Sequence, residues 1–265
     1  MSLAESVCAK LCTLFFSMPT FTFLDTGPNI GAYNMAVDEE LLARAQAGER
    51  TPVLRLYTWD PPAVSLGRFQ KIEEAVDVDA CRKYGFDIVR RITGGRAVLH
   101  RDELTYSVVS RTDNPLFPPS VHGTYKIIAA GLLAGLRNLG IPAEMVSRGG
   151  RFAQLVNKKD ANPACFSSPS WYEIVVNGKK IIGSAQRRLS GAFLQHGSIL
   201  ISYDQKLEAE VLRGAVSSGC ITSIGQELGS APAIEAVKNA FLSGFKSALD
   251  VTFVPVPASD NRYTS

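Results

Sequence analysis

Two short segments of this chain combine residue types that could bind an anionic ligand or let a ligand approach the backbone closely. The first, Arg90–Arg96, reads Arg-Arg-Ile-Thr-Gly-Gly-Arg and is followed by His100. The paired glycines Gly94 and Gly95 let backbone N–H groups approach a ligand closely, as in anion-binding loops. An ordinary hairpin turn with solvated arginines has the same spacing. The segment is neither a Walker loop nor a Rossmann GxGxxG motif.

The second segment, Lys179–Arg188, starts with two lysines directly after a predicted tight turn. Lys180 projects a fixed cation into a cavity if its face of the strand is buried, and is a solvated edge residue if that face is open. Three small residues in the middle of the segment, Gly183, Ser184 and Ala185, would let a ligand come close to the backbone.

Cys165 is the candidate nucleophile, because it lies between a polar stretch, residues 148–162, and a predicted strand. Thiolate chemistry requires partial exposure and a nearby cation. Most single cysteines are inert small hydrophobic residues, and Cys220, in a Ser-Ser-Gly loop, is the rival. Among the histidines we expect His100 to line a site. His122 and His196 are expected to be structural.

Length and composition favour one large domain with a substantial core. The chain has 265 residues, 46% of them hydrophobic and 20% charged, with a formal net charge of +3. A disordered chain is therefore excluded, and the charge is too small to indicate nucleic-acid binding. The longest apolar run, Ile127–Leu136, is about half a membrane span. Five scattered cysteines without a CxxC pair indicate a reducing cytoplasm and no zinc site.

Hydrophobic periodicity predicts an α+β fold with a largely antiparallel sheet. Asn177-Gly178 is the strongest turn signal and starts a three-stranded meander. The predicted helices are 34–47, 125–139 and one capped by Ser230 that ends at Leu249. The predicted strands are 53–59, 86–92, 104–110, 171–176, 179–189, 192–202 and 251–256.

Five motifs in order along residues 21–255 resemble the lipoate/biotin protein ligase family. They are Asn34-Met35-Ala36-x-Asp38, Leu66-Gly67-x-Phe69-Gln70, Arg90-Arg91-x-Thr93-Gly94-Gly95 with His100 and Glu103–Ser107, Asn177-Gly178-x-Lys180-x-x-Gly183-Ser184-Ala185-Gln186, and Gln195-His196-Gly197-Ser198. The resemblance implies a mixed sheet around a cleft, flanked by helices, in residues 21–256. Residues 1–20 would be an extension and residues 257–265 a tail.

Within that family, the chain resembles the cysteine-dependent octanoyltransferase branch. Arg96 stands where lipoate ligases have a third glycine, and little chain follows residue 256. The block Ala164-Cys165-Phe166-x-x-Pro169-Ser170-Trp171-Tyr172-Glu173 is similar to that branch. Arg101, where the family often has aspartate, is a departure.

The resemblance implies transfer of an octanoyl group from acyl carrier protein to a lysine of a lipoyl domain or glycine-cleavage H protein. Cys165 would carry the acyl group and Lys180 would contact its carbonyl. Substrate would be bound by Arg91, Thr93, Gly94, Gly95, Arg96, His100, Gly183, Ser184 and Ala185. No cofactor, metal, nucleic acid or membrane is expected. The alternatives are an ATP-dependent lipoate ligase, with Cys165 as a bystander, and a non-catalytic acyl- or biotin-binding module.

Overall fold

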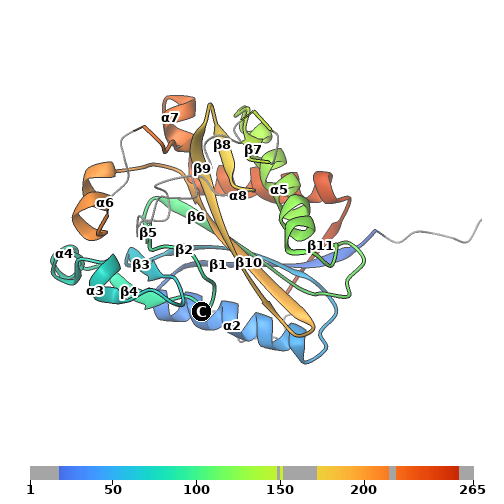
Figure 1. The fold of residues 1–265 in the computed structure, drawn as a ribbon. Helices are drawn as coiled ribbons and strands as arrows, with labels where there is room; N and C mark the ends of the chain where they lie inside the picture. Colours follow the sequence, from blue (N-terminus) through green and yellow to red (C-terminus); the bar gives the residue numbers. More distant parts are fainter. Residues whose placement is uncertain (1–17, 148–149, 152–171, 215–218, 257–265) are drawn as a thin grey trace, which may run out of the picture.

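A computed structural model describes residues 18–147, 150–151, 172–214 and 219–256. Within these ranges the fold is α+β, and a large eight-stranded sheet crosses the molecule with helices on both faces (Figure 1). Its strand order is β11-β1-β2-β6-β10-β9-β8-β7. The bounds are β1 Thr20–Asn29, β2 Val53–Trp59, β6 Glu103–Arg111, β7 Glu144–Met145, β8 Ile174–Val176, β9 Lys179–Leu189, β10 Ala192–Leu200 and β11 Thr252–Pro255.

The large sheet is mixed. Strand β1 runs parallel to β2 and β11, whereas the series from β2 to β7 is antiparallel. The predicted meander is confirmed as β8–β9–β10. Asn177 and Gly178 have φ values of 49° and 80°, the two positive values that a two-residue hairpin turn requires.

A second sheet of three strands packs beside the large one. Its central strand is β3 (Ala63–Leu66), which runs parallel to β4 (Asp87–Arg90) and antiparallel to β5 (Val98–His100). The predicted strand over residues 86–92 is therefore present but shorter. The Gly94-Gly95 turn lies on the connection from β4 to β5, so the small sheet holds both ends of that turn.

Two long helices cover one face of the large sheet, and a third covers the other face (Figure 1). Helices α5 and α8 pack together on the first face, and α2 lies on the second beside the small sheet. The remaining helices in the described ranges are short. The bounds are α2 Gly31–Gln46, α3 Ile72–Ala75, α4 Val78–Tyr84, α5 Val121–Asn138, α6 Gln205–Val211, α7 Ile224–Leu228 and α8 Ile234–Leu249.

The two faces of the central strands differ in chemistry because side chains alternate along a strand. Toward α5 and α8 the strands present apolar groups such as Tyr106 and Phe193, which belong to the main core cluster. Toward α2 and the small sheet they present polar side chains that are also buried. These are Arg55, Thr105, Ser107, His196 and Ser198. Buried polar groups require partners, so this face is where a functional site is expected.

Three predicted helix starts are wrong. The helix predicted over 125–139 begins at Val121, with Ser120 as its N-cap. The C-terminal helix begins at Ile234 with Ala233 as its N-cap, not at a Ser230 cap. Pro232 restricts the residue before it to extended backbone, so the helix begins only after the proline. Helix α2 begins at Gly31 rather than Asn34, whose side-chain amide donates to the carbonyls of Asn29 and Thr58.

Candidate active site

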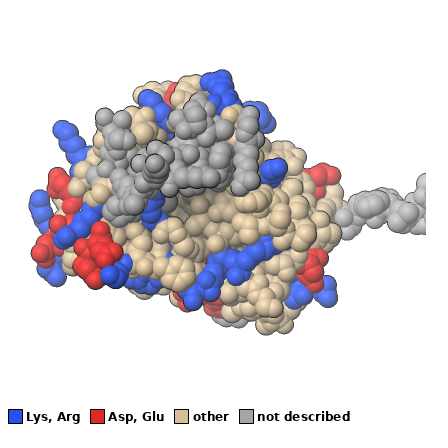
Figure 2. Space-filling view, in the orientation of Figure 1, with Lys and Arg blue, Asp and Glu red and all other residues tan. Residues whose placement is uncertain are grey.

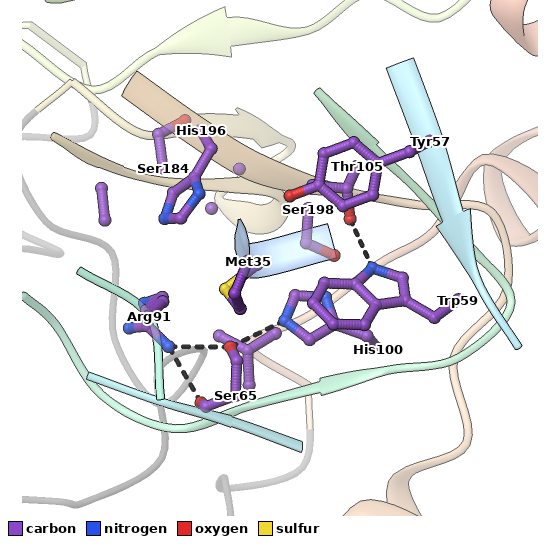
Figure 3. Close-up of a pocket in the computed structure, with 14 residues that line it drawn as sticks. Met35, Tyr57, Trp59, Ser65, Arg91, His100, Thr105, Ser184, His196 and Ser198 are labelled. Atoms are coloured by element: carbon purple, nitrogen blue, oxygen red, sulfur yellow. Dashed lines mark hydrogen bonds between the residues drawn. The ribbon is translucent and has the colours of Figure 1, made fainter. Parts of the chain in front are cut away.

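A cavity of about 380 Å³, including the space at its mouth, lies between the two sheets (Figure 3). Most of its surface is apolar or aromatic, and small residues of β9 and β10 form one side. The lining residues are Met35, Tyr57, Trp59, Ser65, Arg91, Val98, His100, Thr105, Gly183, Ser184, Ala185, His196, Gly197 and Ser198. Five of the predicted site residues therefore line one cavity: Arg91, His100, Gly183, Ser184 and Ala185.

Arg91 joins the small sheet to the Gly94-Gly95 turn. Its guanidinium is buried and uses all five of its N–H donors within the protein. Nη1 donates to the carbonyl and hydroxyl of Ser65, both at 2.9 Å, and Nε donates to the Thr93 hydroxyl at 3.2 Å. Nη2 donates to the carbonyls of Gly94 and Arg96 at 3.0 and 2.7 Å. Arg91 thus holds the shape of the turn.

His100 is fixed on both sides of its ring. Nδ1 lies 3.1 Å from Glu103 Oε1, and Nε2 lies 2.7 Å from the Ser65 hydroxyl. The ring stacks on Trp59 with 4.1 Å between centroids, as Figure 3 shows. Burial lowers the pKa of His100, and nearby Arg91 adds to this although Glu103 opposes it. The imidazole is therefore neutral at pH 7.

His196 occupies a matching position on β10. Nε2 lies 2.7 Å from the Thr93 hydroxyl and Nδ1 lies 2.9 Å from Asp38 Oδ2. Burial alone would raise the pKa of Asp38, but hydrogen bonds from His196 and Arg55 and the charge of Arg55 lower it. His196 was expected to be structural. Both its ring nitrogens are indeed paired, and its ring also lines the cavity.

The predicted glycine turn lies against the cavity wall rather than inside it. Thr93, Gly94, Gly95 and Arg96 are absent from the lining, and they contribute through Arg91 and His196. A Cβ on Gly67 would lie 1.9 Å from the Gly95 carbonyl oxygen, so this approach requires glycine. A Cβ on Gly94 would meet nothing within 4 Å.

Lys180 faces the cavity side of the large sheet because of a β-bulge. Ile174 pairs with Ile182 and Val175 with Lys180, so Ile181 is the extra residue. Both Ile181 and Ile182 pack in the main core cluster, which turns Lys180 to the opposite face. Its amine is buried and lies 2.5 Å from Glu173 Oε1. Lys180 is not among the residues that line the cavity, although Gly183 is three residues further along its strand.

The described ranges locate two of the five cysteines. Cys220 accepts a hydrogen bond at its carbonyl from the Lys180 N–H, at 2.8 Å, so the rival cysteine lies beside the candidate lysine. Cys81 is buried, and this burial raises the pKa of its thiol to about 11, which makes it a poor nucleophile. Cys165 lies outside the described residues. In these ranges no group of histidine, cysteine and carboxylate side chains is arranged to hold a metal ion.

Several residues of the cavity wall and of its supporting contacts were missed from the sequence. Tyr57 and Trp59 lie on the predicted strand 53–59, whereas Ser65 lies on β3, which no predicted strand covers, and no local motif distinguishes the three. Glu173 was noted only as part of the cysteine block, and the residue it pairs with is on the next strand. Asp38 belongs to a quoted motif, but its contact with His196 spans 158 residues of sequence.

Comparison with known proteins places this cavity in a known catalytic domain. The family model of the lipoyl protein ligase A/B catalytic domain matches residues 31–246, which include every wall residue named above. This chain belongs to that family. An octanoyltransferase LipM of Brevibacillus brevis is 43% identical over 92% of each chain, and one of Kyrpidia tusciae is 42% identical over 90% of each.

Solved structures of the family agree with the fold. A lipoate-protein ligase A bound with ATP has a TM-score of 0.74 at 25% identity, with 92% of each chain covered. A T. acidophilum protein with bound lipoic acid has a TM-score of 0.70 at 26% identity over the same share. The α+β prediction and the family resemblance are both confirmed. No helix in the described ranges is long and apolar enough to span a membrane.

Proposed function

We propose that this protein transfers an octanoyl group from octanoyl acyl carrier protein to a lysine of a lipoyl domain or glycine-cleavage H protein. The observation that supports this most is the identity of about 40% to octanoyltransferases over nearly the full length of both chains. The cavity adds to it, because its aromatic and small apolar residues suit a straight hydrocarbon chain.

The proposed reaction has two steps through Cys165. The Cys165 thiolate attacks the thioester carbonyl carbon, the carrier sulfur leaves as a thiol after taking a proton, and an octanoyl–cysteine thioester forms. The acceptor lysine amine then attacks this thioester, loses a proton and forms the amide, and the Cys165 thiol is restored. The first step is a near-neutral exchange and the second is downhill, so no nucleotide is required.

Lys180 would steady the charge that develops on the acyl oxygen. A buried cation held by Glu173 has a fixed position, which is what electrostatic stabilisation of an oxyanion requires. Gly183, which lines the cavity, would flank the acyl chain near its carbonyl, and the Gly94-Gly95 turn would support the wall through its contact with Arg91.

Acidic carrier proteins would dock through surface arginines and lysines, and the reaction belongs in the cytoplasm with the carrier. Arg91 is buried and is not part of this basic surface. Lys179 and Arg187 are eight residues apart on β9, about 26 Å by strand rise, so they serve different parts of the surface. Figure 2 shows lysine and arginine gathered in the lower centre of one face.

An ATP-dependent lipoate ligase is the second candidate, since a structural relative was solved with ATP. Intact-mass spectrometry separates the two. The protein is mixed with octanoyl carrier protein and a lipoyl domain, without nucleotide or magnesium, and the masses of all three are followed. We expect one octanoyl group on the lipoyl domain. Modification only with free octanoate or lipoate plus ATP would establish the ligase instead.

A further inference from the structure

Arg91 starts two parallel chains of hydrogen bonds that end in buried carboxylates. Through Nη1 it donates to Ser65, which contacts His100, and through Nε it donates to Thr93, which contacts His196. The far nitrogens of the two rings contact Glu103 and Asp38 respectively. In Figure 3 the Arg91–Ser65–His100 chain follows one edge of the cavity.

The hydroxyls of Ser65 and Thr93 each have one proton, and each has one acceptor for it among these contacts. A guanidinium only donates, so the oxygens of Ser65 and Thr93 accept from Arg91. The contact left for each hydroxyl proton is the Nε2 atom of its histidine, at 2.7 Å in both cases. Nε2 must then carry no proton, and Nδ1–H donates to the carboxylate. A proton on either Nε2 would leave a buried hydroxyl proton without an acceptor among these contacts, so the arrangement favours neutral imidazoles.

The charged side chains around the two histidine rings sum to zero when both rings are neutral. Arg91 and Arg55 supply two positive charges, and Glu103 and Asp38 supply two negative ones; all four side chains are buried. Tyr57, which donates to Asp38, has its pKa raised well above the ordinary value, mainly by burial, and is neutral. A proton added to either histidine would leave a net positive charge in a buried cluster, which is costly.

We propose that Ser65 and Thr93 are positioning residues that hold His100 and His196 as neutral Nδ1–H imidazoles, so that the cavity accepts an uncharged acyl chain and rejects one that ends in a carboxylate. The acyl-chain specificity rests on the proposed function, whereas the protonation state of the histidines does not. A terminal carboxylate would find no donor in either ring or on Arg91, which has already used its five N–H groups. Among the described lining residues the Ser198 hydroxyl is left without a partner, and one neutral hydroxyl does not replace the water around a carboxylate, so burial there is strongly unfavourable.

The histidine states are tested by ¹⁵N NMR of the side chains, recorded without substrate. The chain has three histidines, so the spectrum is simple, and exposed His122 is an internal reference. We expect the Nδ1–H pattern for both rings at pH 7.5, and for His100 also at pH 6, because its pKa is lowered. Ser65→Ala should change the His100 signals and spare those of His196, and Thr93→Val should do the reverse.

Matched variants separate positioning from a general loss of structure. Ser65→Thr and Thr93→Ser keep the hydroxyl and should restore the wild-type spectra. Ser198→Ala removes another cavity hydroxyl, one without a hydrogen-bond partner among the described residues, and should leave both histidines unchanged. A charged or Nε2–H state of His100 and His196 in the wild type would overturn the inference, as would Ser65→Ala and Thr93→Val spectra identical to it.

Chain specificity is tested with octanoyl and octanedioyl carrier proteins, whose eight-carbon chains differ in a terminal carboxylate. Wild type should show a KM at least roughly 100-fold higher for the octanedioyl donor. Ser65→Ala should raise the octanoyl KM roughly tenfold at pH 6, with a smaller change in kcat, since His100 is then free to take a proton. Equal KM values for the two donors would refute the specificity while leaving octanoyl transfer established.

Discussion

The Lys180 amine and the Glu173 carboxylate face each other at 2.5 Å across the hairpin that Asn177-Gly178 closes, and both side chains are buried. The pair exists because of one extra residue in β9. Without the bulge at Ile181, strand alternation would point Lys180 toward the core of α5 and α8, where a charge would have no partner. The bulge thus converts a core position into a position for a fixed cation.

Breaking this pair from one side should cost much more stability than removing it entirely. Glu173→Gln leaves a buried ammonium and Lys180→Met leaves a buried carboxylate, each at roughly 3–5 kcal/mol by the behaviour of buried ion pairs. The double variant should lose clearly less than the sum of the two. Urea unfolding of all four proteins gives the coupling energy. An additive result would mean that the pair is not coupled in solution.

The exposed pair Lys71 and Glu74 is the matched control. Its atoms lie 2.8 Å apart, but both side chains are about two-thirds exposed. The same two substitutions there should hardly change the unfolding midpoint, because solvent screens such pairs.

Lys180 should also matter for catalysis. Lys180→Ala should slow octanoyl transfer by about 100-fold or more, the usual effect of losing one oxyanion donor. Glu173→Gln keeps the amine and should slow transfer less. Rates are measured under conditions where circular dichroism shows each variant folded. Near-normal turnover in Lys180→Ala would remove this residue from the mechanism.

Two glycines near the cavity should differ in how much stability is lost when each is replaced by alanine. Gly67→Ala would place a Cβ 1.9 Å from the Gly95 carbonyl oxygen, so the turn must move and stability should fall by several kcal/mol. Gly94→Ala meets nothing within 4 Å and should keep the wild-type melting temperature. If Gly94 lies beside bound substrate, this stable variant should have a raised KM. Thermal melts and transfer kinetics on the same samples decide both points.

The elements of the fold were largely predictable because their signals are local. Asn177-Gly178 specifies a hairpin turn by its two positive φ values, and the strand at 53–59 matches β2 to the residue. The site was predictable only where a motif marks it, as for Arg91, His100 and Gly183–Ala185. The contacts that complete it are not local. No sequence pattern near Ser65 indicates that it contacts Arg91 and His100. The alternation of side chains along β9 likewise gives no sign of the bulge at Ile181.

Acidification should destabilise the protein through His100. Its folded pKa lies below the unfolded value of about 6.5, so below that pH the unfolded chain binds a proton that the folded state resists. Stability should therefore fall as pH drops below about 6.5, by at most about 1.4 kcal/mol per pH unit for this group. The pKa of Asp38 is lowered, so its contribution is lost only below about pH 4.

Denaturant midpoints at pH 7.5, 6.5 and 5.5 test this. His100→Gln removes the titrating ring and should flatten the dependence, even though it lowers stability at pH 7.5 by losing the stack on Trp59. His122→Gln, at an exposed position, should keep the wild-type slope. An unchanged slope in His100→Gln would show that the proton uptake belongs to another group.

The choice of nucleophile lies between Cys165 and Cys220, and the position of Cys220 beside the Lys180 backbone makes the comparison sharper. A cysteine next to a cation is a reasonable nucleophile on position alone. We nevertheless predict that Cys165 carries the acyl group, because it is the cysteine within the block similar to cysteine-dependent octanoyltransferases. Incubation with octanoyl carrier protein should add one octanoyl mass, removable by neutral hydroxylamine, to the peptide that contains Cys165.

Two matched variants decide the assignment. Cys165→Ala should abolish both the adduct and the transfer, whereas Cys220→Ala should retain both, since only the Cys220 backbone carbonyl is needed to bind the Lys180 N–H. Cys81→Ala serves as a further control, because its buried thiol, with a pKa of about 11, is hardly ionised near neutral pH. An adduct on the Cys220 peptide would make Cys220 the nucleophile. Full transfer by Cys165→Ala without any adduct would instead require direct attack by the acceptor amine. ATP-dependent ligation would then be the next activity to test.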